Sequence, residues 1–297
     1  MQKKSHRVDR RLAVAATIIL GLCTVVTLFP VILLVSGSVT LESALITHGY
    51  TLIPKQFSLD AYRYLVKKFA SVGRAYLVTV GTTVIGTGLS LTLTTSIAYP
   101  MARSTFKYRN ALAFFVYFTM LFNGGIVPSY IMWTRFFHIQ NTYAALVIPN
   151  LLMNAFNILL IRNYYKNSIP ATLYEAAMLD GASEFNIFIR VALPLAVPVA
   201  STVALFTALT YWNSWTNAMY YITEPEYFGI QNYLMRIMKN IEFLRSNTDA
   251  VDETVITLPG QSIRMAIALI GILPIIVIYP FLQKYFIKGI VIGAVKE

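Results

Sequence analysis

Few side chains in this 297-residue sequence have the types and spacing that chemistry requires. The histidines His6, His48 and His138 are far apart, and no two of them have the spacing of metal ligands. Cys23 is the only cysteine, so the chain cannot form an internal disulfide. The sequence also contains no Gly-x-x-x-x-Gly-Lys-[Ser/Thr] phosphate loop. We therefore predict no catalytic residue, no metal site and no cofactor in this chain.

A short acidic segment, residues 163–186, holds the most distinctive candidate residues. Pro170 suits the first turn of a helix, good helix formers follow it, and Gly181 can adopt the positive φ that ends a helix. A helix with an Ala-Ala pair is thin enough to enter a groove on another protein, where Glu175 and Asp180 would be anchoring charges. On the residues alone, a solvated loop is the alternative. The candidates are Glu175, Ala176, Ala177, Asp180, Gly181 and Ala182.

The composition indicates that this segment belongs to a membrane protein. Hydrophobic residues make up 57% of the chain and charged residues only 12%, whereas soluble domains carry about 25% charged residues. A net charge of +11 could favour nucleic acid. In so apolar a chain it indicates instead cytoplasmic loops rich in Lys and Arg. We predict a lipid bilayer as the environment and no nucleic-acid partner.

Six runs free of Asp, Glu, Lys and Arg are each long enough to cross a bilayer, which takes about 20 apolar residues. Alternation with a period of two residues is absent, which disfavours a β-barrel. The first run is too long for a signal peptide and has no cleavage pattern after it. We predict an all-α membrane protein with a transmembrane domain at 12–290. Its six helices are predicted at about 12–36, 75–100, 110–133, 141–162, 187–213 and 265–288.

The distribution of charge predicts the orientation of these spans. With the N-terminus in the cytoplasm, the inside segments hold 14 Lys and Arg against 5 Asp and Glu, and the outside segments hold 10 against 8. Short cytoplasmic loops are enriched in Lys and Arg. Residues 1–11, the loop 163–186 and the tail 291–297 are therefore predicted to be cytoplasmic.

A second set of candidates consists of polar and aromatic side chains at membrane depth. Such groups are costly in lipid and usually face protein or water. Aromatic faces and amide groups suit sugars, which offer apolar ring faces and hydroxyl edges. Hydrogen bonding between helices is the alternative for each residue. The candidate pathway residues are Asn123, Asn154, Asn157, Tyr211, Trp212 and Asn213.

Three short stretches in and after the acidic loop resemble the EAA signature of ABC importer permeases. They are Glu175-Ala176-Ala177, Asp180-Gly181-Ala182 and Val191-Ala192-Leu193-Pro194. Gly181 has the family spacing from Ala177, whereas Val191 stands where isoleucine is usual.

Other stretches extend the resemblance to the MalG-type permeases of the carbohydrate uptake transporter-1 family, and within it to the LplC-like branch that is linked to complex oligosaccharides. Two places depart from the pattern, because Arg74-Ala75 replaces a common Asn-Ser and Gly229-Ile230-Gln231 replaces a common Pro-Leu-Gln. The stretches that match include Asn123-Gly124-Gly125, Tyr211-Trp212-Asn213-Ser214-Trp215 and Tyr279-Pro280-Phe281-Leu282.

The resemblance implies the type I ABC importer permease fold in a bacterial cell membrane, and a non-catalytic subunit for oligosaccharide import. It implies a second permease subunit, two ATPase subunits that bind ATP and Mg, and an extracellular sugar-binding protein that could be a lipoprotein. The loop 163–186 would be the coupling helix that docks on an ATPase. Gly293 and Lys296 in the C-terminal tail would be a second contact with the ATPases.

Three alternatives make different demands on the sequence. A secondary transporter or channel would need intramembrane charges, which the six charge-free runs disfavour. A membrane enzyme would need clustered His, Asp or Glu in the spans. An ABC permease for a non-sugar solute stays open, because the EAA signature alone does not exclude it.

Overall fold

The computed structural model describes residues 2–246 and 260–294. These residues are helical except for loops and one isolated β-bridge between Thr40 and Phe57. They form two compact units. The first comprises the described residues of Met1–Phe69 and Arg236–Pro274, and the second comprises those of Ala70–Met235 and Ile275–Glu297.

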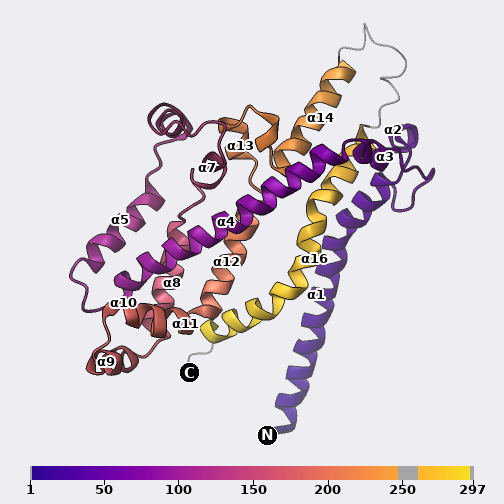
Figure 1. Cartoon of the computed structure of the whole chain (residues 1–297). Helices are drawn as coiled ribbons and strands as arrows, with labels where there is room; N and C mark the ends of the chain where they lie inside the picture. Colours follow the sequence, from indigo (N-terminus) through magenta and orange to yellow (C-terminus); the bar gives the residue numbers. More distant parts are fainter. Residues whose placement is uncertain (1, 247–259, 295–297) are drawn as a thin grey trace. The chain divides into compact units, whose positions relative to one another are not determined.

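The first unit contains a long apolar helix followed by two short helices (Figure 1). In α1 (Gln2–Ser38), the apolar stretch Leu12–Ser38 is 27 residues long, which is enough to cross a membrane. The short helices are α2 (Glu42–His48) and α3 (Asp60–Lys67), and the unit is completed by parts of α14 (Ile230–Ser246) and α16 (Gln261–Ala294).

The carboxylate of Glu42 joins α2 to the start of α16 inside this unit. Its oxygens accept hydrogen bonds from the backbone N–H of Gln261, at 2.8 and 2.9 Å, and of Ser262, at 3.0 Å. The first N–H groups of a helix have no partner within the helix, and the helix dipole favours a negative charge there. Glu42 therefore caps α16 from a position more than 200 residues earlier in the sequence.

The second unit is built around α4 (Phe69–Ala102), with shorter helices packed along it (Figure 1). Its core at one end consists of buried side chains such as Met101, Ile161, Tyr165 and Ile187. The shorter helices are α5 (Arg109–Leu121), α6 (Ile126–Ile131) with the π-helical turn η1 (Met132–Phe136), α7 (Tyr143–Val147), α8 (Ala155–Asn167), α9 (Ala171–Leu179), α10 (Glu184–Ile187) with the π-helical turn η2 (Phe188–Ala192), α11 (Leu193–Leu195), α12 (Val197–Trp212), α13 (Thr216–Tyr221) and the 3-10 turn η3 (Pro225–Tyr227).

The helices agree with the predicted spans in part. Among the described residues, Leu12–Ser38 and Phe69–Ala102 are unbroken and long enough to cross a membrane. The third predicted span is bent by 112° between α5 and α6–η1, and the fifth by 77° before α12. The fourth is interrupted between Val147 and Ala155. The count of six spans and the cytoplasmic position of the termini stay predictions.

Local sequence explains two of these breaks. Gly125, at the bend of the third segment, has φ of 86°, which glycine adopts without strain. In the fourth segment, Asn150 has φ of 58°, and Pro149 has no N–H to donate to a helix. Asn154 then caps α8, because its side chain accepts a hydrogen bond from the backbone N–H of Asn157.

Candidate functional site

The predicted short helix of the acidic loop is α9, and it ends where the sequence predicts. Its last turn closes with hydrogen bonds from the N–H of Gly181 to the carbonyl of Met178 and from the N–H of Ala182 to that of Ala177, both at 3.0 Å. Gly181 has φ of 78°. This turn reverses the chain into α10, for which the side chain of Ser183 is the N-cap.

One face of α9 is open to solvent. Glu175, Ala176, Asp180 and Gly181 are exposed, and the side chain of Leu179 is 89% exposed. The exposed part of α9 therefore combines two carboxylates with small residues and large apolar side chains, of which Leu179 is the most exposed. Such a surface suits a partner that covers it, since a large apolar side chain gains by leaving water.

The opposite face of α9 anchors it to the unit. Tyr174 is 5% exposed, and its ring packs at 69° against that of Tyr99 on α4, with 6.3 Å between the ring centres. Ala177 and Ala182 are half-buried against the same core. The six candidates in this loop therefore divide into four exposed residues and two that pack inward.

A charged cluster that the sequence reasoning did not single out joins this loop to α4. Arg103, the residue after α4, donates from Nη2 to Oε1 of Glu184 at 3.1 Å. The hydroxyl of Tyr99 donates to Oε2 of the same carboxylate at 2.7 Å. The guanidinium of Arg103 lies 4.5 Å from the ring centre of Tyr174. We name these four residues, Tyr99, Arg103, Tyr174 and Glu184, the α4–α9 cluster.

The cluster keeps Glu184 ionised. Burial raises the pKa of this carboxyl, but hydrogen bonds from Tyr99 and Arg103 and the positive charge of Arg103 outweigh burial, so its pKa lies below the ordinary value. Glu184 lies in the loop before the predicted fifth span. The two members Arg103 and Glu184 are 81 residues apart, so no local pattern could have paired them.

The six candidate pathway residues lie in the turn after α5, in α8 with its N-cap, and at the end of α12. Most of their polar groups are bonded within the protein. Asn123 accepts from Gly125 N–H at 2.8 Å, Asn157 donates to Thr207 at 3.4 Å, Tyr211 donates to the carbonyl of Val147 at 2.9 Å, and Asn213 donates to the carbonyl of Leu209 at 2.9 Å. Asn154 is the N-cap of α8, and the ring of Trp212 lies 6.2 Å from that of Tyr76.

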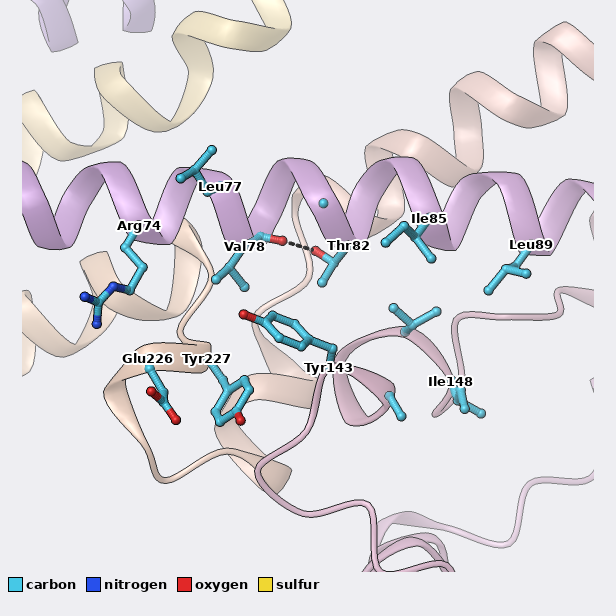
Figure 2. A pocket seen from close by; sticks show the side chains of 13 residues that line it. Arg74, Leu77, Val78, Thr82, Ile85, Leu89, Tyr143, Ile148, Glu226 and Tyr227 are labelled. Carbon is cyan, nitrogen blue, oxygen red and sulfur yellow. Dashed lines mark hydrogen bonds between the residues drawn. The ribbon is translucent and has the colours of Figure 1, made fainter.

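A different set of residues lines a pocket of about 810 Å³ beside α4. Figure 2 shows Arg74, Glu226 and Tyr227 at one end of it and Ile85 and Leu89 along α4 toward the other. The volume lies within the range of about 300–1,000 Å³ that is usual for small-molecule sites.

Tyr143 lies between the two ends of this pocket (Figure 2). Its ring contacts the edge of the Tyr227 ring, at 75° and with 5.0 Å between the centres. Arg74 and Glu226 form no hydrogen bond or ion pair within the described parts of the chain, so their charges are free. Arg74 is also one of the two departures from the family pattern.

The remaining candidates lie in the tail. Gly293 belongs to the last turn of α16, but its surroundings are not described, and Lys296 lies outside the described residues. Over residues 2–246 and 260–294, no group of three or more His, Cys, Asp or Glu could hold a metal ion.

Comparison with known proteins decides the family. Residues 90–292 match the family model described as "Binding-protein-dependent transport system inner membrane component". The chain belongs to this family. As a member, it is a membrane permease subunit of an ABC importer, which works with ATPase and substrate-binding partners.

Individual members of the family confirm the predicted resemblance. The chain is 37% identical to Protein LplC of Bacillus subtilis (strain 168), covering 93% of this chain and 92% of LplC. It is 35% identical to the polygalacturonan/rhamnogalacturonan transport system permease protein YtcP of the same organism, covering 90% and 92%. A chain of a bacterial ABC transporter involved in import of the acidic polysaccharide alginate matches with a TM-score of 0.78 and 30% identity, covering 94% and 98%.

Proposed function

We propose that this chain is the permease subunit of an ATP-driven importer for oligosaccharides and forms half of its translocation pathway. The observation that carries the proposal is the likeness over 90% of the chain to a polygalacturonan/rhamnogalacturonan permease and over 94% of the chain to a subunit of an alginate importer. An ABC permease for a non-sugar solute is the alternative.

We further propose the assembly in which it works. A second, homologous permease subunit completes the pathway, two ATPase subunits bind ATP and Mg below it, and an extracellular sugar-binding protein, such as a lipoprotein, delivers the substrate. The chain crosses a bacterial cytoplasmic membrane six times with both termini inside. The charge distribution supports this orientation, because short cytoplasmic loops carry the excess of Lys and Arg.

The open face of α9 is the proposed contact with an ATPase. Glu175, Ala176 and Asp180 are exposed, whereas Tyr174 fixes the opposite face to α4. A helix held on one side and open on the other can pass a rigid-body movement from a partner to the spans. In the tail, Gly293 and Lys296 are proposed as a second contact.

The pocket beside α4 is a better candidate for sugar contact than the six polar residues inferred from sequence. A ligand needs groups that are free to bond, and most of those six are engaged. The pocket offers the free charges of Arg74 and Glu226 and the ring pair of Tyr143 and Tyr227. The guanidinium of Arg74 would pair with the carboxylate of an acidic sugar unit.

Reconstitution tests the function and the pocket together. The chain would be purified with its co-assembling permease, ATPases and binding protein, placed in liposomes and supplied with ATP. We expect uptake of oligogalacturonides or another oligosaccharide. In the Arg74→Gln variant, uptake of acidic oligosaccharides should fall more than uptake of neutral ones.

Two results would separate the parts of the proposal. Uptake of a non-sugar solute, with no oligosaccharide transported by the wild type, would overturn the sugar assignment. Equal uptake by wild type and the Arg74→Gln variant for every transported sugar would overturn the role of the pocket alone. Lys68→Gln, an exposed cation just before α4, is the matched control.

A further inference from the structure

The cytoplasmic end of α4 has no direct backbone connection to α9. The chain runs from α8 through α9 into α10, whereas α5 to α8 separate α4 from α9 in the sequence. The link between α4 and the loop is made by side chains. Among them, the α4–α9 cluster supplies the directional contacts, through Arg103 and Tyr99 on the α4 side.

We propose that Arg103 is a positioning residue that fixes the angle between α9 and α10 and holds both helices against α4. Displacement of α9 by the ATPase subunits would then move α4 together with α8 and α10. The inference rests on the coupling role proposed for α9 and names the residue that extends this coupling to α4.

One side chain contacts both sides of the turn at Gly181. On the α9 side, the guanidinium of Arg103 lies over the ring of Tyr174, and its Nη2 lies 3.7 Å from Sδ of Met178. On the α10 side it pairs with Glu184. A change in the angle between α9 and α10 would therefore break at least one of these contacts.

The burial of Arg103 makes a change in the angle between α9 and α10 unfavourable. The side chain of Arg103 is 8% exposed, so its charge has little access to water. Glu184 is its ion-pair partner, and a buried charge without a partner is strongly unfavourable. Both oxygens of this carboxylate are used, one by Arg103 and one by Tyr99, which fixes its orientation relative to α4.

Several buried polar groups in and beside the α4–α9 cluster have no hydrogen-bond partner within the described residues. Nε of Arg103 and the hydroxyl of Tyr174 are buried without a hydrogen-bond partner within the described residues, as is the hydroxyl of Tyr165, whose ring packs against that of Tyr99. Buried polar groups in stable cores nearly always have partners. These donors have little access to water, so loss of the Arg103–Glu184 contact would leave still more buried polar groups without a partner.

The test compares variants of the complete transporter in liposomes. Arg103→Met removes the charge and keeps the length of the side chain, Glu184→Gln keeps the shape of the partner, and Tyr99→Phe removes one hydrogen bond. Lys107→Met is the matched control, because Lys107 is an exposed cation four residues later. The measurements are uptake and ATP hydrolysis, each divided by the amount of assembled complex.

We expect uptake per ATP hydrolysed to fall about fivefold or more in Arg103→Met and Glu184→Gln, which corresponds to the lower end of typical coupling between sites. The double variant should be no worse than the worse single variant, since both remove one contact. Arg103→Lys should restore uptake only in part, because Lys cannot stack and bond as a planar fork.

A merely structural role gives a different result. It lowers the amount of assembled complex but leaves uptake per ATP hydrolysed at the level of Lys107→Met, and that outcome would overturn the proposal. If Arg103→Met does not assemble, the same ratio in Glu184→Gln and Tyr99→Phe decides. A wild type that transports no oligosaccharide would instead count against the proposed function.

Discussion

At the scale of single residues, Gly181 gives a prediction that separates backbone strain from steric fit. An added Cβ would meet no atom within 4 Å, so the cost of Gly181→Ala comes from its φ of 78° alone. Left-handed backbone costs a non-glycine residue about 1–2 kcal/mol. We expect a lower thermal midpoint of the purified complex and reduced uptake.

Gly88→Ala is the control for this prediction. Gly88 also has open space around it, but it lies within α4 without a positive φ. Alanine favours a helix by about 1 kcal/mol over glycine, so this change should be neutral or stabilising. Equal effects of the two substitutions on the thermal midpoint would contradict the strain that we assign to Gly181.

Glu42 gives a second prediction at this scale. Glu42→Ala leaves two backbone N–H groups and the hydroxyl of Ser262 at the start of α16 without their acceptor. Loss of partners for buried donors costs about 1–3 kcal/mol. We expect a clear fall in the thermal midpoint for Glu42→Ala and a smaller one for Glu42→Gln, which keeps one acceptor oxygen.

Asp60→Asn is the matched control for Glu42. Asp60 is also an acidic residue at the start of a short helix, but its ion pair with Arg63 is exposed and spans only one helical turn. Such pairs contribute about 0.3–0.5 kcal/mol. An Asp60→Asn effect as large as that of Glu42→Ala would contradict a special role for the α16 cap.

At the scale of elements, the approach of α4 to α12 depends on Gly86. An added Cβ there would collide with the ring of Tyr211, whose hydroxyl is held by the carbonyl of Val147. Overpacking of this kind costs about 1–3 kcal/mol. Gly86→Ala should lower the thermal midpoint, and Gly88→Ala again serves as the control. A Gly86→Ala variant as stable as wild type would show that the two helices can separate at little cost.

At this scale, the sequence predicts a feature when the residues that determine it are neighbours in the chain. The end of α9 was predictable, because Pro170, helix formers and Gly181 stand next to one another. The interruption of the third and fourth spans was not, because a charge-free run shows how apolar a segment is and not where its backbone turns. The positive φ values of Gly125 and Asn150 mark those turns.

The candidate site likewise has parts that the sequence could predict and parts that it could not. The exposed face of α9 was found from adjacent residues, whereas the pair of Arg103 and Glu184 depends on chain folding across 81 positions. The pathway residues were chosen as polar groups in apolar runs. That criterion also selects caps and helix–helix bonds, and Asn154 and Tyr211 serve those purposes.

At the scale of the whole molecule, the breaks in the apolar segments bear on how movement of α9 would reach the rest of the chain. The bends after α5 and before α12 divide two apolar segments into separate parts, and we expect these parts to move separately. With the orientation that the charge distribution predicts, the α4–α9 cluster would make the cytoplasmic parts move as one body, and the breaks in the third and fourth segments would let the outer parts respond differently. Hinges at element ends are the usual way in which such movements are accommodated.

The proposed coupling depends most on the predicted membrane topology. The native Cys23 would first be replaced by serine, so that each added cysteine is the only one in the chain. With the orientation derived from charge, Lys55→Cys should react with a membrane-impermeant thiol reagent in intact cells. Gln2→Cys, Thr172→Cys and Lys296→Cys should react only after the membrane is opened.

The pattern of labelling distinguishes the ways in which this topology could be wrong. Lys55 and Thr172 are separated by three predicted spans, so they must lie on opposite sides if each of those segments crosses the membrane. Labelling of both from outside would show that an odd number of the segments between them does not cross, and the bent α5–α6 segment is the first to doubt. In that case α9 would face away from the ATPases, and neither Glu175 nor Arg103 could transmit their movement.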